Sequence, residues 1–172
     1  MDYLVPAPAD DPRSSYEIYR AKGTTAEMLL TRLMVLAARR WRAQLDEKLR
    51  PLGQSAARME ALSAIINSPD PSSQIDIAKR LKIEGPTMTR MIDSLTADGL
   101  VERRPAPGDR RTKHLVLTAK GDSTLATIFA VMDPLRKRLL AGIPAAELAH
   151  LTAFFETVLD RLESANGQRA GD

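Results

Sequence analysis

A polar helix face between residues 85 and 98 is the part of this sequence best suited to direct chemistry. At about 100° per residue, a helix there gathers its large apolar side chains on one side. The opposite side carries Thr87, Arg90, Ser94 and Ala97. Arg90 can donate two hydrogen bonds to a guanine or bind a phosphate, and Thr87 and Thr89 can reach a phosphate or a thymine methyl group. An ordinary exposed helix arginine is the alternative interpretation of Arg90.

A basic hairpin follows this helix. Expected strands over residues 101–104 and 113–117 flank a loop from Pro105 to Arg110, and residues 100–117 contain five basic side chains against two acidic ones. A tip bearing Arg110 and Arg111 has the charge to enter a minor groove, where Asp109 would orient a neighbouring arginine and cap the turn. Three further phosphate-contact candidates lie on the strands, Arg103, Arg104 and Lys113. A solvated charged loop is the alternative.

Two short helices and a turn position the polar face. The spacing predicts helices over residues 73–81 and 85–98, joined by a link over residues 82–84. Pro86 suits the first turn of the second helix because its missing N–H costs nothing there. Small Ala78 permits the two helices to approach closely, and Gly99 suits a left-handed helix end. Together these elements predict a winged helix-turn-helix, a mainly α fold with a small β-hairpin wing.

Longer helices flank this lobe. We expect an N-terminal arm over residues 1–23 with a short helix near Ser15–Arg20, and a flexible tail over 165–172. Between them we expect helices over 24–52 and 55–67, a helix from Thr118 that is kinked at Pro134, and a last helix over about 145–162. The arm is either a mobile terminus or packs on a partner subunit. The outer helices carry more apolar surface than one lobe buries. We therefore expect one domain over 24–164, in which 24–52 and 119–164 form a dimer and 55–117 binds DNA.

The composition excludes several classes of protein. The 172 residues carry a net charge of +3, are 44% hydrophobic, and include no cysteine and two histidines. Disulfide frameworks, thiolate metal sites and thiol redox switches are therefore excluded, and we expect no metal site and no cofactor. Catalytic and phosphate-loop motifs are missing, so we expect no enzymatic activity. With neither a signal-peptide pattern nor an apolar run near the roughly 20 residues of a membrane span, we expect a cytoplasmic protein.

The motifs in this region resemble one family of transcription regulators. The run from Ser73 to Arg90, followed by Asp98-Gly-Leu-Val-Glu-Arg103, Asp109-Arg-Arg111 and Leu117-Thr118, is similar to the MarR family, with the SlyA-like branch as the nearest match. The resemblance covers about residues 24–162. It implies a dimer of winged helix-turn-helix lobes that binds a pseudo-palindromic operator. By position, Pro86, Thr87 and Arg90 resemble recognition-helix contacts, and Asp109 and Arg111 resemble the wing pair.

The same resemblance implies an effector pocket where the dimer helices meet the DNA lobe. Members of the family usually repress genes until a small aromatic acid or a related ligand binds. The candidate pocket residues are Arg39 as a carboxylate partner, Arg58, Met59, Ser63 and Trp41. Trp41 could stack on a ring, although a lone tryptophan at helical spacing is more often part of a core.

These observations predict a DNA-binding transcriptional regulator, a homodimer and a repressor that a ligand releases. Two alternatives stay open. One is an architectural DNA-binding protein that senses no ligand. The other is a winged helix that binds protein, which the small and polar recognition face disfavours.

Overall fold

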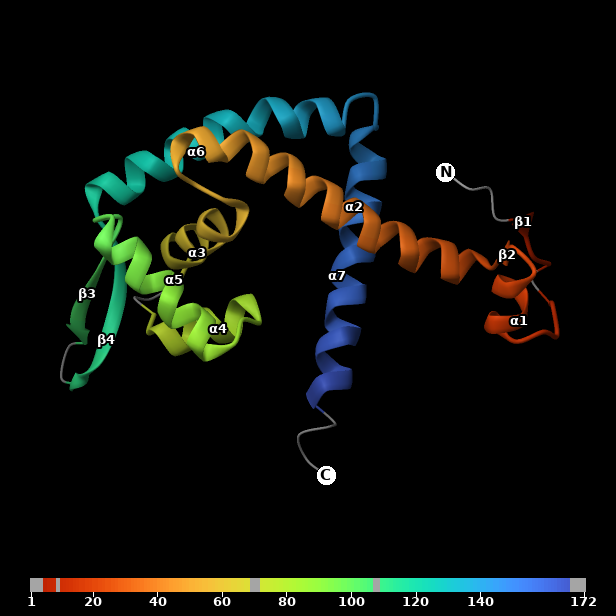
Figure 1. Cartoon of the computed structure of the whole chain (residues 1–172), viewed down its shortest axis with the longest axis horizontal. Coiled ribbons are helices and arrows are strands. Elements are labelled where there is room, and N and C mark those ends of the chain that lie inside the picture. The colour runs from red at the N-terminus through yellow and green to blue at the C-terminus, as the bar shows by residue number, and fades with distance from the viewer. Residues whose placement is uncertain (1–4, 9, 69–71, 107–108, 168–172) are drawn as a thin grey trace. The chain divides into compact units, whose positions relative to one another are not determined.

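The computed structural model describes residues 5–8, 10–68, 72–106 and 109–167, and the side chains of residues 106, 109–111 and 165–167 lie outside this description. The helices are α1 (Ser15–Arg20), α2 (Ala26–Leu49), the 3-10 turn η1 (Arg50–Leu52), α3 (Ala56–Ile66), α4 (Gln74–Leu81), α5 (Gly85–Ala97), α6 (Ala119–Leu139) and α7 (Ala145–Gly167). The strands are β1 (Val5–Pro6), β2 (Gly23–Thr24), β3 (Val101–Ala106) and β4 (Asp109–Leu117) (Figure 1). The predicted mainly helical fold with a β-hairpin is confirmed.

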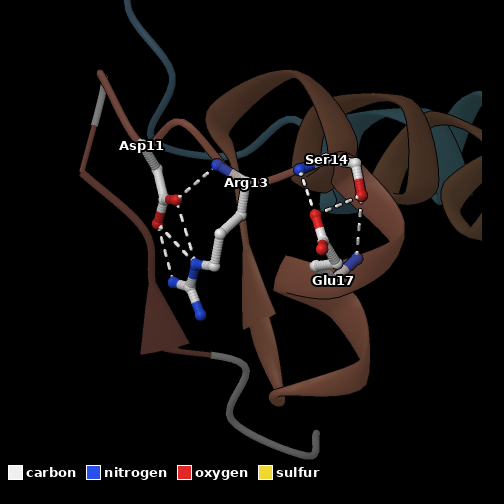
Figure 2. Close-up of polar contacts among 4 residues, drawn as sticks. All are labelled: Asp11, Arg13, Ser14 and Glu17. Carbon is white, nitrogen blue, oxygen red and sulfur yellow. Dashed lines mark hydrogen bonds and ion pairs between the residues drawn. The ribbon is translucent and has the colours of Figure 1, made fainter.

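The N-terminal residues 5–8 and 10–24 form a small unit, which we call the N-terminal clip. The predicted short helix α1 is confirmed, and Ser14 and Glu17 close its first turn as a capping box (Figure 2). Parallel pairing of β1 with β2 joins the ends of the clip around the buried side chain of Ile18. A Cβ atom at Gly23 would lie 2.9 Å from Ile18 Cγ2 and 3.0 Å from the Ile18 carbonyl oxygen, so a larger residue there would force Ile18 to shift. The sequence did not predict this pairing.

An ion pair completes the N-terminal clip. Arg13 Nε and Nη2 donate to the Asp11 carboxylate, and the Arg13 N–H donates to the same group at 3.0 Å (Figure 2). The hydrogen bonds from the Arg13 side chain, followed by the backbone bond, lower the pKa of Asp11 to about 2. The Asp11 side chain is 7% exposed, so this carboxylate is held inside the turn that precedes α1.

The winged helix-turn-helix lobe spans α3 to β4. Its core consists of fully buried apolar side chains from every element of the lobe: Leu62, Ile77, Met88, Ile92, Leu95, Leu100, Val101 and Leu115. The predicted apolar face of α5 is confirmed, with Met91 only half-buried. The predicted left-handed Gly99 is also confirmed, at a φ of 71°. The lobe therefore holds α5 by one side and leaves the other side accessible.

The hairpin is longer than the sequence predicted. Pro105 carries no N–H, which suggested a loop from Pro105 to Arg110. In the structure the antiparallel pairing continues past it, with Pro105 opposite Lys113 and Ala106 opposite Asp109. A register shift between Pro105 and Ala106 accommodates the proline. The wing consequently extends to residues 106 and 109.

The helices outside the lobe leave many apolar side chains in solvent. By internal contacts the chain divides into two units, residues 1–131 and 132–172, and α6 runs continuously across this boundary through Pro134. In the first unit the exposed side chains of α2 are Leu29, Leu30, Leu33 and Val35. In the second unit those of α7 are Leu151, Phe154, Phe155, Leu159 and Leu162. In the described part of the chain, no helix is both long and apolar enough to cross a membrane.

Candidate nucleic-acid interface

The turn between α4 and α5 is built by local backbone hydrogen bonds. Ser73 caps α4 together with Asp76, and the hydrogen bonds from the Ser73 hydroxyl and N–H lower the pKa of Asp76. At the other end Lys82 adopts a left-handed φ of 52°, and the Ile83 N–H donates to the Ala78 carbonyl. This reversal sends the chain directly into α5. The sequence predicted the link but gave no signal that a lysine would take the left-handed position.

The polar face of α5 is exposed as predicted. The side chains of Pro86, Thr87, Arg90, Ser94 and Ala97 are all in solvent. Among the described residues, the Arg90 guanidinium has no hydrogen-bond or ion-pair partner, so all five of its N–H groups remain available. An unpaired arginine in the first two turns of a helix-turn-helix second helix lies where major-groove bases are contacted.

Thr89 and Arg103 are bonded within the lobe. The Thr89 hydroxyl accepts a hydrogen bond from Gln74 Nε2 at 2.7 Å and donates to the Gly85 carbonyl. Arg103 Nη2 lies 2.7 Å from Asp93 Oδ1 and also donates to Gln74 Oε1. These bonds join α4, α5 and β3. Sequence reasoning placed Thr89 and Arg103 among the DNA contacts and missed that they also brace α5.

The wing candidates divide into two groups. Lys113 is exposed on β4 opposite Pro105, as a phosphate contact would require. The backbones of Asp109, Arg110 and Arg111 belong to β4, but their side chains lie outside the described residues, so the roles predicted for them stay predictions.

The expected effector residues lie on α2 and α3. Arg39 is exposed on α2, and Trp41 and Met59 are half-buried. Arg58 donates to three partners, two of them on or just after α5. Ser63 lines a hollow of about 250 Å³.

Two neighbouring hollows lie where α3 meets α6 and β4. One of about 250 Å³ is lined by Ser63, Ile66, Asn67, Asp122, Leu125, Ala126 and Phe129. The other has a volume of about 470 Å³ and is also lined by Ile66 and Asp122. Its lining further includes residues 115–119, which run from the end of the wing into the start of α6. Asp122 is the charged residue in both linings. Sequence reasoning missed it because an acidic residue in the first turn of a helix is common and signals no pocket.

Comparison with known proteins assigns the chain to a family. A model described as the MarR family matches residues 53–112. A crystal structure titled transcriptional regulator PA3341 matches with a TM-score of 0.71 and 37% identity, over 78% of this chain and 98% of that one. Wild-type MarR from E. coli matches with a TM-score of 0.64 and 30% identity, over 76% of this chain and 96% of that one. The chain belongs to the MarR family.

This MarR-family chain is also similar to a relative that was crystallised together with DNA. A mutant MarR from E. coli, crystallised with operator DNA, is similar to it with a TM-score of 0.68 and 28% identity, over 77% of this chain and 94% of that one. The family and the winged-helix fold that the motifs predicted are therefore confirmed.

Proposed function

We propose that this chain is a sequence-specific DNA-binding transcriptional regulator that reads its operator with α5. The observation that carries the proposal is the exposed face of α5, on which the Arg90 side chain has no partner among the described residues while the opposite face is buried in the lobe. The crystal structure of a similar MarR with operator DNA supports it. Regulation of this kind involves no catalytic step, and we propose a cytoplasmic location.

The proposed DNA contacts fall into two groups. Pro86, Thr87 and Arg90 contact the major groove from α5, with Arg90 as the base-reading group. On the wing, Arg110 and Arg111 contact the backbone or the minor groove, Asp109 orients them, and Lys113 contacts a phosphate. Thr89 and Arg103 take a phosphate only in addition to their bonds within the lobe. On the motif Asp109-Arg-Arg111 we further propose a SlyA-like branch.

We also propose that the active form is a homodimer. The exposed leucines and phenylalanines of α2 and α7 exceed what a soluble monomer normally leaves in water. A second copy that covers them would place two recognition helices about 34 Å apart, one turn of DNA. In this division residues 24–52 and 119–164 form the dimer, 55–117 binds DNA, and 1–23 and 165–172 are additions to the ends.

The effector proposal moves from the expected residues to the hollows between α3 and α6. Phe129, Leu125 and Ile66 offer apolar contacts to the ring of a small aromatic acid or a related ligand. Asp122 repels a carboxylate beside it, so the acid group of such a ligand would point away from Asp122. Ligand binding that favours a dimer with mismatched recognition helices would release the operator, which is the action of a repressor.

The test is selection of genomic fragments by the purified protein, followed by sequencing of the bound DNA. We expect a few pseudo-palindromes with half-sites one turn apart, and we expect Arg90→Ala to lose this selection. Arg20→Ala is the matched control. It removes an exposed arginine from α1, and we expect this variant to keep the selection of the operator. Random or merely AT-rich fragments would indicate an architectural protein instead, and no bound DNA would indicate a protein-binding winged helix.

A further inference from the structure

One arginine bridges two helices of the lobe. Arg58 lies on α3, and its Nη1 donates to Ser94 Oγ on α5 at 2.8 Å while its Nη2 lies 2.5 Å from Asp98 Oδ2 at the end of α5. Its Nε donates to Gln54 Oε1 at 3.0 Å, which fixes the plane of the guanidinium. The Arg58 side chain is only 13% exposed, so water screens these bonds less than those of a surface pair.

The end of α5 that Arg58 holds is also bonded to α6. The Thr118 hydroxyl donates to the Gly99 carbonyl at 2.7 Å, and Lys120 Nζ donates to the Asp98 carbonyl at 2.8 Å. The C-terminal end of α5 is thus anchored from α3 on one side and from α6 on the other. Arg90 itself lies nearer the opposite, N-terminal end of the helix.

Small rotations about this anchor have large consequences for base contacts. Arg90 precedes Asp98 by eight residues, which is about 12 Å along a helix. A tilt of about 5° at the anchored end would displace Arg90 by about 1 Å, whereas hydrogen bonds tolerate only about 0.5 Å of variation in length. The orientation of α5 therefore matters more for reading bases than for binding phosphates through flexible side chains.

We propose that Arg58 is a positioning residue for DNA recognition, setting the orientation of α5 by holding Ser94 and Asp98. The inference rests on the proposed function, in which α5 reads the operator. It assigns Arg58 to the lobe rather than to an effector. Loss of Arg58 leaves Asp98, which is 54% exposed, in contact with water, so folding is affected less than specificity.

The experiment measures the ratio of operator affinity to non-specific DNA affinity at one salt concentration for the full-length protein. Arg58→Met keeps an unbranched apolar side chain and removes the donors, and Asp98→Ala removes the acceptor at an exposed position. We expect each variant to lower the ratio by about tenfold, chiefly by weakening operator binding. The double variant should lose no more than Arg58→Met alone, because loss of Arg58 already removes the contact with Asp98.

A neighbouring ion pair supplies the matched control. Arg42 on α2 forms two hydrogen bonds with Glu60 on α3 and, among the described residues, no hydrogen bond or ion pair with α5. Arg42→Met should therefore leave the ratio within about twofold of the wild type. The Arg58→Lys variant keeps one charged donor group. Its affinity ratio should therefore lie between those of Arg58→Met and the wild type. A second readout needs no DNA: hydrogen exchange at the amides of residues 94–99 should be faster in Arg58→Met than in Arg42→Met.

The outcomes separate the two proposals. If the wild type prefers no operator, the proposed function and the positioning role both fail. If the wild type prefers its operator and Arg58→Met and Asp98→Ala keep the full ratio, the function stands and the positioning role is overturned. Additive losses in the double variant, or exchange at residues 94–99 equal to that of Arg42→Met, would also overturn it.

Discussion

Replacement of Gly121 by alanine is expected to destabilise the lobe, although alanine normally favours a helix. Gly121 is buried in the first turn of α6, and a Cβ atom there would lie 2.0 Å from the Leu100 carbonyl oxygen and 3.0 Å from its carbon. Ordinary contact begins at 3.4 Å, so one backbone segment must move by about 1.4 Å. The Leu100 side chain is itself buried at the start of β3, which prevents an easy shift.

The magnitude follows from three opposing terms. Overpacking of this kind costs about 1–3 kcal/mol. The movement also strains the bonds that join the two segments, the Thr118 N–H to the Leu100 carbonyl and the Thr118 hydroxyl to the Gly99 carbonyl, worth about 1 kcal/mol each. Alanine returns about 1 kcal/mol of helix propensity. With one of these bonds lost, the net expectation is a loss of about 2 kcal/mol, or about 4–8 °C in Tm for a chain of this size.

Thermal unfolding followed by circular dichroism at one protein concentration measures this loss. Ser123→Ala is the matched control, because it raises helix propensity at an exposed position of the same helix and should leave Tm unchanged or slightly higher. A Gly121→Ala protein that melts at or above the wild-type temperature would refute the close approach of α6 to Leu100.

Three further outcomes are expected. Arg90→Ala should cost roughly 1–3 kcal/mol of operator binding and relax specificity at one base. Arg111→Ala should weaken binding to all sequences and reduce the slope of the logarithm of the binding constant against the logarithm of salt concentration by about 1. Binding like that of the wild type by both variants would contradict the contact assignment. The depressed pKa of Asp11 means that its ion pair stabilises the N-terminal clip above pH 3.8 and is lost as the pH falls towards about 2. The amide NMR signal of Arg13 should therefore titrate near pH 2 and not near 4, and Asp11→Asn should abolish the transition. Leu159→Glu, on the exposed apolar face of α7, should shift sedimentation towards the monomer, and an unchanged dimer would exclude that face from the interface.

Local features of the fold follow closely from the order of residues. The predicted short helix over Ser15–Arg20, the two faces of α5 and the left-handed Gly99 all occur as expected. Helical periodicity, capping and the conformational freedom of glycine depend on side chains within a few positions, so the sequence contains the whole cause. The exposed Arg90 belongs to this class, because burial of the opposite face requires its exposure.

Several features that the sequence did not predict involve residues that are distant in the chain. Arg58 bonds to Ser94 and Asp98, which are 36 and 40 residues away, and the sequence did not predict these bonds. The clip similarly pairs Val5 with Gly23, and the hollows bring Asp122 beside α3. An arginine has the same donors whichever carboxylate it meets, so its partner depends on which helix surfaces pack together. That choice is made by burial of the apolar core, and only the folded chain reveals which polar groups it brings into contact.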